Sequence, residues 1–153
     1  MAFTMPEIFK ISVAAACPSH SRTDVTARQH TIVIDEPPHR GGTDVAQTPL
    51  ETLLASFLGC TNVIANMIAE DMGIEIDNLS LALTAKLDTR GVFDKARVKV
   101  PFPEIAITVE VTTEADDAQI EELKTALARR CPVSTILRQS GSQIIETWNV
   151  TRP

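Results

Sequence analysis

One stretch, residues 48–73, constrains the fold more than any other part of the chain. It begins with Thr48, Pro49 and Glu51, the pattern of a helix N-cap, a proline at the first helical position and a capping box. It ends at Gly73, a residue typical of the position after a helix. The sequence therefore predicts a helix of about 23 residues, or about 35 Å at 1.5 Å per residue. Because this helix is apolar on most faces, we expect a second subunit to supply part of its cover.

The composition is that of an ordinary globular protein. At 153 residues, with 44% hydrophobic and 22% charged residues, the chain fits one domain spanning residues 1–153. The formal net charge of −6 argues against a nucleic-acid partner or an anionic membrane. The long helix contains polar residues, which favours a core helix over a membrane span.

The cysteines and the start of the chain predict a cytoplasmic protein. No basic segment followed by a long apolar run opens the sequence, so no secretory signal is expected. Three cysteines, an odd number, in a chain without a signal peptide indicate a reducing compartment. None of them forms a CxxC pair, so structural disulfides are not expected.

Alternating and β-branched patterns predict strands before and after the long helix, and two shorter helices near the end of the chain. Strands are expected at residues 7–16, 22–28, 31–35, 78–89, 105–113 and 143–150. The shorter helices are expected at residues 116–130 and 131–137. The Pro- and Gly-containing segments 36–42 and 90–104 predict loops.

Cys60, in the middle of the long helix, has two interpretations. Free cysteine is commonly a small buried hydrophobe. Gly59 before it and Thr61 and Asn62 after it would also leave room for a substrate and donors for a thiolate. The middle of a helix offers little dipole field to favour that thiolate, so the local pattern leaves both interpretations open.

Cys131 lies at a different kind of position. Pro132 fits the first helical position, which puts Cys131 at or near the N-cap of the third helix. The positive end of that helix and the nearby Arg129 and Arg130 would favour a thiolate. The alternative is a corner between two helices that carries a cysteine without chemical use.

Other residues that could carry chemistry have simpler explanations. Glu51 is a possible general base, but it completes the capping box, and nine residues at about 100° each put it on the face opposite Cys60. Cys17 and His20 are two potential zinc ligands without a second pair, so no metal site is predicted.

Three motifs in this order resemble the OsmC/Ohr family, the osmotically inducible and organic hydroperoxide resistance proteins. They are GGTD at residues 41–44, TPLETLLASFLGCT at 48–61 and CPVSTIL at 131–137. The likeness runs from about Arg22 to Trp148.

The resemblance implies an α+β, two-layer fold in which antiparallel sheets pack around long central helices, in intertwined homodimers. It implies an antioxidant enzyme of the oxidative stress response, a thiol peroxidase that reduces organic or small hydroperoxides. Cys60 would attack the peroxide and become a sulfenic acid, and Cys131 would resolve it to a disulfide. An external dithiol, such as a lipoyl group on a carrier protein, would reduce that disulfide, so no bound cofactor is expected.

The sequence departs from this family at one point. In the hydroperoxide reductases a carboxylate ten residues before the first cysteine holds the activating arginine, and that position is Leu50 here, one residue before Glu51. Arg22 is the expected thiolate stabiliser, with Arg28 and Arg40 as alternatives. The departure motivates a second hypothesis, a non-catalytic protein that binds a small hydrophobic ligand or senses redox state through Cys60.

Overall fold

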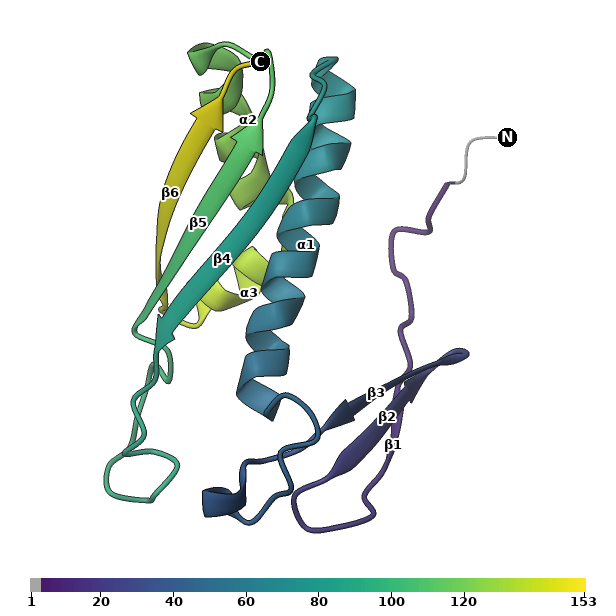
Figure 1. The fold of residues 1–153 in the computed structure, drawn as a ribbon, viewed down its shortest axis with the longest axis vertical. Coiled ribbons are helices and arrows are strands. Elements are labelled where there is room, and N and C mark those ends of the chain that lie inside the picture. Colours follow the sequence, from purple (N-terminus) through teal and green to yellow (C-terminus); the bar gives the residue numbers. More distant parts are fainter. Residues whose placement is uncertain (1–3) are drawn as a thin grey trace. The chain divides into compact units, whose positions relative to one another are not determined.

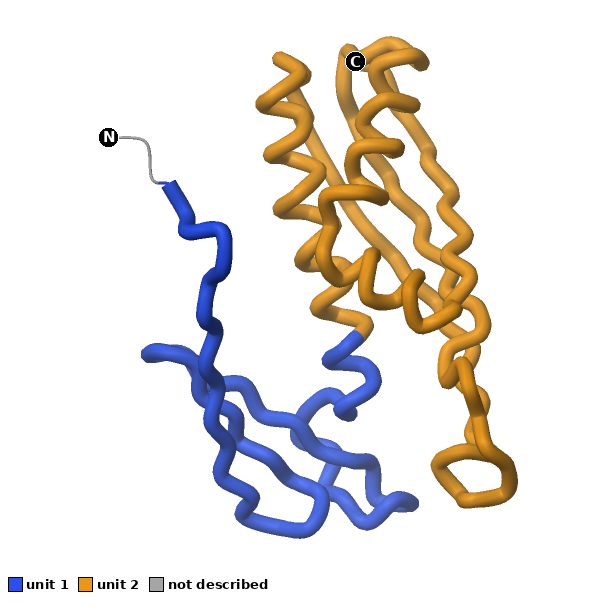
Figure 2. The backbone as a smooth tube through the Cα atoms, turned by 180° about the vertical axis from the view of Figure 1, so that it is seen from behind, with its two compact units in different colours: residues 1–53 blue, residues 54–153 orange. Residues whose placement is uncertain are grey.

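The computed structural model describes residues 4–153, and the chain divides into two compact units. The first unit ends at Leu53 and the second runs from Leu54 to Pro153 (Figure 2). The boundary falls within the first turns of the long helix α1, Pro49–Met72.

The first unit contains a small antiparallel sheet in the order β1-β2-β3. Its strands are β1 Ala14–Ala16, β2 Thr23–Ala27 and β3 His30–Ile34. The second and third match the predicted strands. The predicted strand at residues 7–16 is wrong for its first seven residues, because β2 pairs only with Ala14, Ala15 and Ala16.

A buried carboxylate shapes the segment between this sheet and α1. Asp35 is fully buried, and its Oδ2 accepts hydrogen bonds from the Thr43 backbone N–H at 3.0 Å, the Thr43 hydroxyl at 2.6 Å and the Val45 N–H at 3.3 Å. These hydrogen bonds, the Thr43 hydroxyl first, hold the pKa of Asp35 well below its ordinary value. The same turn brings Gly42 so close to Glu36 that an added Cβ would lie 1.7 Å from the Glu36 carbonyl oxygen. Only glycine fits there.

The start and end of α1 agree with the sequence prediction. The Thr48 backbone N–H donates to the Glu51 carboxylate at 2.8 Å, and the Glu51 N–H donates to the Thr48 hydroxyl at 3.3 Å. This reciprocal pair is a capping box. Gly73 follows the helix in the left-handed conformation, with φ at 68°. Within the loop before α1, residues 38–40 form a short 3₁₀ helix, η1.

The second unit contains a mixed sheet in the order β4-β5-β6. Its strands are β4 Asn78–Lys86, β5 Glu104–Thr112 and β6 Gln143–Thr151. The expectation of antiparallel sheets is correct for β4 and β5 but wrong for β6, which runs parallel to β5. The physical reason is the connection: α2 and α3 lie between β5 and β6 and carry the chain back to the end from which β5 starts.

Three helices cover one face of this sheet (Figure 1). They are the part of α1 from Leu54, α2 Asp117–Arg130 and α3 Pro132–Gln139. Alternate residues of β5 form the centre of the core and are at most 4% exposed: Ile105, Ile107, Val109 and Val111. The second unit is therefore the two-layer α+β arrangement that the sequence predicted.

Many side chains of α1 remain exposed in the single chain. Its buried side chains face the sheet: Phe57, Thr61, Ala65, Ile68 and Ala69. Two apolar residues on another face, Val63 and Met67, are 55% and 47% exposed. By length and composition alone α1 could also cross a membrane, as the core helices of many soluble proteins could.

We expect Thr48→Ala to lower the free energy of unfolding by about 1 kcal/mol, because the substitution removes the side-chain half of the capping box. Glu51→Gln is the matched control, since glutamine also fits this position and its effect should stay within about 0.5 kcal/mol. Urea denaturation followed by circular dichroism measures both. Equal losses in the two variants would contradict this account of the cap.

The same cap carries a pH dependence. The Thr48 N–H lowers the pKa of Glu51 below 4.5, so the carboxylate stabilises the folded state above that pH. The stabilisation is lost as the pH falls through the lowered pKa, and Glu51→Gln should lack this part of the pH profile.

Candidate functional site

Two cysteines that are 71 residues apart in sequence meet in the second unit. The Cys131 thiol donates to Cys60 Sγ, with the sulfur atoms 3.0 Å apart. Cys60 lies in the middle of α1 and is half-buried, while Cys131 is fully buried at the junction of α2 and α3. Both are free thiols, so the geometry brings together the two cysteines that the sequence singled out.

Cys131 is the N-cap of α3, as predicted, and its sulfur accepts a weak hydrogen bond from the Ser134 N–H at 3.4 Å. The expectation that this position favours a thiolate is wrong in the reduced protein. Burial, followed by the contact with Cys60, raises the pKa of Cys131 well above its ordinary value. Arg129 is exposed and Arg130 pairs with Asp71 at 2.6 Å, so neither compensates for the burial.

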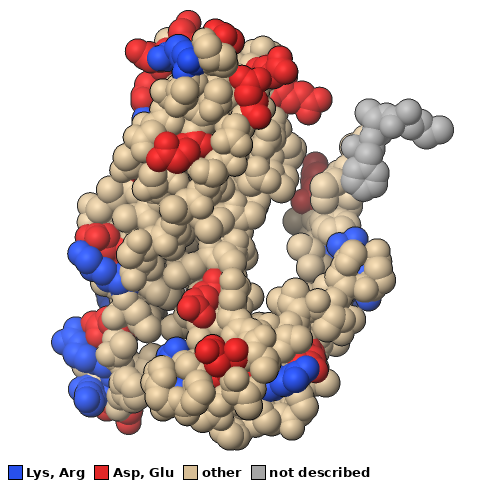
Figure 3. Space-filling view, viewed as in Figure 1, with Lys and Arg blue, Asp and Glu red and all other residues tan. Residues whose placement is uncertain are grey.

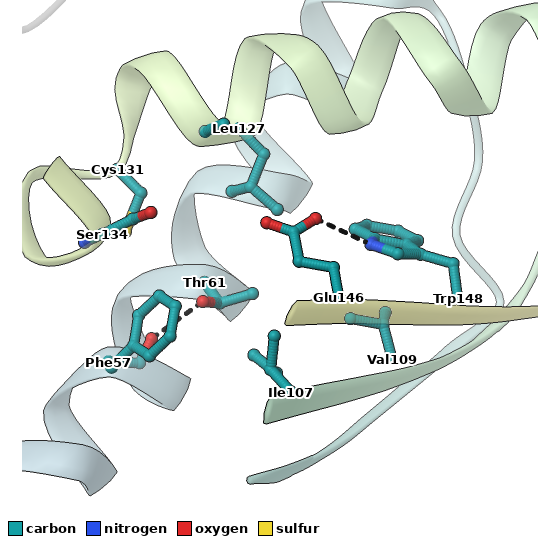
Figure 4. Close-up of a pocket in the computed structure, with 10 residues that line it drawn as sticks. Phe57, Thr61, Ile107, Val109, Leu127, Cys131, Ser134, Glu146 and Trp148 are labelled. Atoms are coloured by element: carbon teal, nitrogen blue, oxygen red, sulfur yellow. Dashed lines mark hydrogen bonds between the residues drawn. The ribbon is translucent and has the colours of Figure 1, made fainter. Parts of the chain in front are cut away.

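A small cavity lies beside Cys131, on the sheet side of the helices (Figure 4). Its volume is about 10 Å³, room for about one water molecule. Most of its lining is apolar: Phe57, Ile107, Val109, Leu127, Ala128 and Trp148. The cavity is too small for an organic molecule, so a substrate would have to reach the sulfur pair from the half-buried Cys60.

A chain of hydrogen bonds leads from this cavity to Cys131. Trp148 Nε1 donates to one oxygen of Glu146 at 3.2 Å, and Arg138 Nη2 donates to the other at 2.9 Å. Arg138 Nε also donates to Ser134 Oγ at 3.2 Å, next to the Ser134 N–H that reaches Cys131. The chain therefore ties the first turn of α3 to strand β6.

These polar residues were not found by sequence reasoning, although a signal was present. Ser134 and Arg138 follow Cys131 at three and seven residues, which puts all three on one side of a helix. Glu146 and Trp148 alternate along β6 and so share the face toward the helices. The signal is weak by itself, because the same spacings occur in any amphipathic element.

The other predicted site residues lie in the first unit. Arg22 directly precedes β2 and pairs with Asp24, with Nε–Oδ1 at 2.8 Å and Nη2–Oδ2 at 3.3 Å. Glu51 holds the cap of α1. Arg40 pairs with Glu36 at 3.0 Å. Among residues 4–153, no three His, Cys, Asp or Glu side chains are grouped so that they could hold a metal ion.

The sulfur pair has one direct chemical capacity. Two thiols 3.0 Å apart need to move by only about 1 Å to reach the bond length of a disulfide, about 2.05 Å. Cys17, in the first unit, is exposed and forms no disulfide. The geometry therefore supports reversible oxidation between Cys60 and Cys131.

A family model described as OsmC-like protein matches residues 41–146 of the chain. This range contains Cys60 and Cys131, α1 from its cap onward, strands β4 and β5, and the first part of β6. A search of curated proteins found no match.

Solved structures with the same fold cover nearly the whole chain. An OsmC-like protein from Mycoplasma pneumoniae is 26% identical, with a TM-score of 0.75, over 94% of this chain and 97% of that one. An organic hydroperoxide resistance protein from Legionella pneumophila is 15% identical, with a TM-score of 0.62, over 95% and 99%. OhrB of Bacillus subtilis, also an organic hydroperoxide resistance protein, is 20% identical, with a TM-score of 0.57, over 94% and 98%. The last two similarities concern the fold alone.

We expect the thiol oxidant diamide to join Cys60 and Cys131 within one chain, because their sulfur atoms are already in contact. Mass spectrometry after alkylation should find this disulfide in the wild-type protein and in Cys17→Ser. Arg138→Met should slow its closure about tenfold, because Cys131 then loses the contacts that fix the first turn of α3.

Arg130→Met is the matched control for the arginine, since Arg130 pairs with Asp71 on the neighbouring surface and has no bond to Ser134. Closure at the wild-type rate in Arg138→Met would show that the hydrogen-bond chain does not position Cys131. Failure of the wild-type protein to form the disulfide would contradict the chemical capacity itself.

Proposed function

The chain belongs to the OsmC-like family, and from this premise we propose that it is a thiol peroxidase that reduces organic or small hydroperoxides. The observation that carries the proposal is the contact between Cys60 and Cys131, two free cysteines in the two cysteine motifs of the chain. The named hydroperoxide resistance proteins of the same fold support a role in redox chemistry or peroxide stress.

Cys60 is the proposed nucleophile because it is the more accessible of the two thiols. Its thiolate attacks the outer peroxide oxygen, the O–O bond breaks, and the alkoxide leaves as an alcohol after taking a proton. Cys60 becomes a sulfenic acid.

Cys131 is the proposed resolving thiol. Its sulfur attacks the Cys60 sulfenic acid, a disulfide forms, and the hydroxyl leaves as water with the proton of Cys131. Because burial raises the pKa of Cys131, this thiol rests in its neutral form and is protected from direct oxidation. An external dithiol, such as a dihydrolipoyl group, then reduces the disulfide and becomes oxidised.

Arg22 is the proposed cation that stabilises the Cys60 thiolate. Leu50, in α1, has no carboxylate that could pair with such an arginine. Asp24, two residues after Arg22, pairs with it instead. Asp24 therefore provides locally the carboxylate partner that the helix does not.

A homodimer is the proposed assembly. Gly59 is exposed in the middle of α1, and nothing lies within 4 Å of a Cβ added there. Glycine in a helix interior lowers helix stability by about 1 kcal/mol relative to alanine. A second chain whose backbone packs closely against α1 would explain a glycine at this position. Together with Val63 and Met67 it forms an uncovered face on the helix.

A second candidate is favoured by Leu50. Without a carboxylate at that position the chain could be a non-catalytic family member that binds a small hydrophobic ligand or senses redox state through Cys60. This candidate keeps the sulfur contact but predicts no turnover of peroxides.

The test is turnover of cumene hydroperoxide with dihydrolipoamide, followed by the fluorescence of Trp148, the only tryptophan of the chain and a neighbour of Cys131 in the cavity. We expect Cys60→Ser to abolish turnover. Cys131→Ser should still form one sulfenic acid per chain, detectable with dimedone, without closing a disulfide. Turnover that survives Cys60→Ser would exclude the proposed nucleophile, and none in the wild-type protein would favour the second candidate.

Arg22→Met tests the proposed cation in the same series. Removing the positive charge should shift the half-maximal rate of Cys60 alkylation by iodoacetamide to higher pH. Lys10→Met, which also removes one positive charge from the first unit, is the control. An Arg22→Met profile equal to that of the wild-type protein would exclude Arg22 from this role.

For the dimer, we expect light scattering to give the mass of two chains for the wild-type protein and of one chain for Val63→Asp/Met67→Asp. A charge in the middle of an apolar interface costs several kcal/mol, enough to dissociate a moderate dimer. Ile136→Asp, at an apolar position of α3 that is 63% exposed, should leave the mass unchanged. A monomeric wild-type protein would contradict the proposal.

A further inference from the structure

The loop between β4 and β5, residues 87–103, is the basic part of an acidic chain. It carries four cations against two carboxylates, whereas the chain as a whole has a formal net charge of −6. Figure 3 shows Lys and Arg side chains gathered at the lower left, where Figure 1 places this loop. We name residues 87–103 the basic loop.

Three cations of the basic loop are free to meet a partner. Arg90 is paired within the loop, with Asp88. Lys95, Arg97 and Lys99 are exposed, and within the described chain none of them has a carboxylate at ion-pair distance. Their charges are therefore not neutralised by the protein itself.

The basic loop also presents apolar surface. Val92 and Phe93 are 69% and 63% exposed, and the Lys95 ammonium lies 5.8 Å from the centre of the Phe93 ring. Aromatic side chains flanked by cations are typical of protein interfaces, where they supply contact area beside charge complementarity.

Hydrogen bonds order the basic loop. The Asp88 N–H donates to the Pro101 carbonyl at 2.9 Å, and the Lys95 N–H donates to the Arg90 carbonyl at 2.8 Å. Gly91 packs so closely that a Cβ there would lie 3.1 Å from Val98. A partner would bind a surface that is already formed, which lowers the entropic cost of association.

The basic loop lies close to the helix that carries Cys131. The Gln143 N–H donates to the Pro103 carbonyl at 3.0 Å, and a Cβ on Gly141 would lie 2.9 Å from a methyl group of Val100. Gly141 follows the C-terminus of α3, whose N-cap is Cys131. The helix has eight residues and is therefore about 12 Å long, so the end of the basic loop at Val100 lies about one length of α3 from Cys131.

We propose that the basic loop docks an acidic protein surface that carries the dithiol reductant of the Cys60–Cys131 disulfide, an inference that rests on the proposed function. The carrier gives two electrons and two protons: its two thiols become a disulfide, and Cys60 and Cys131 return to thiols. A protein fits the loop better than an anionic membrane. Membrane recognition uses clusters of about four to eight cations, and this loop has three unpaired ones in a chain whose remainder is strongly acidic.

The test compares two reductants on protein that has been oxidised with diamide, so it does not depend on peroxidase activity. One is a dihydrolipoyl carrier domain of net negative charge, and the other is dithiothreitol, which is uncharged and needs no docking site. The variant reverses the three unpaired cations: Lys95→Glu, Arg97→Glu and Lys99→Glu. The control makes the same change of charge elsewhere: Lys10→Glu, Lys124→Glu and Arg152→Glu.

We expect the loop variant to slow reduction by the carrier domain at least about tenfold and to leave reduction by dithiothreitol unchanged, since charges at an interface act mainly on association. Raising the salt from 20 to 200 mM should slow the wild-type reaction with the carrier but not the variant reaction. The control variant should behave as the wild-type protein does. Equal carrier rates in all three proteins would overturn the proposal.

A direct binding measurement tests the docking proposal independently of the proposed peroxidase function. Calorimetry with the carrier domain and Cys60→Ser/Cys131→Ser protein needs no redox step and should show binding that the loop variant loses. Binding to vesicles with 30% phosphatidylserine, without binding to the carrier domain, would overturn the proposal in favour of a membrane surface. Loss of the dimer in the loop variant would overturn it in favour of a second copy of the chain.

Discussion

The contact between the Cys60 and Cys131 sulfur atoms is the interaction on which the proposed chemistry depends. It joins a residue in the middle of one helix to the N-cap of another. Cys60 offers access, while Cys131 offers a buried thiol that donates to it. In the proposed reaction the attacking thiol must be accessible to the peroxide and the resolving thiol must be protected from it. One cysteine could not meet both requirements, and the pair divides them.

The surroundings of the pair keep its members in place. On one side the apolar residues of β5 and α2 exclude all but about one water molecule. On the other, the bonds from Glu146 through Arg138 to Ser134 hold the turn that carries Cys131. A rigid frame of this kind suits a reaction in which two sulfur atoms must approach by about 1 Å and separate again.

Much of this could be predicted from local patterns. The cap at Thr48 and Glu51, the stop at Gly73 and the proline after Cys131 are short-range signals, and each gave the correct helix boundary. The direction of β6 depends on how α2 and α3 return to the sheet, which no local pattern states. The protonation of Cys131 was misjudged for the same reason, because its burial is set by elements far away in the sequence.

The separation of the two cysteines along the chain has a thermodynamic consequence. A disulfide between Cys60 and Cys131 would close a loop of about 70 residues, which in the chain-entropy description restricts the unfolded state by about 4 kcal/mol. That is a large fraction of the stability of a domain of this size. The oxidised form would therefore resist unfolding and proteolysis better than the reduced form. The lifetime of each molecule would then depend on the last reaction that its thiols underwent.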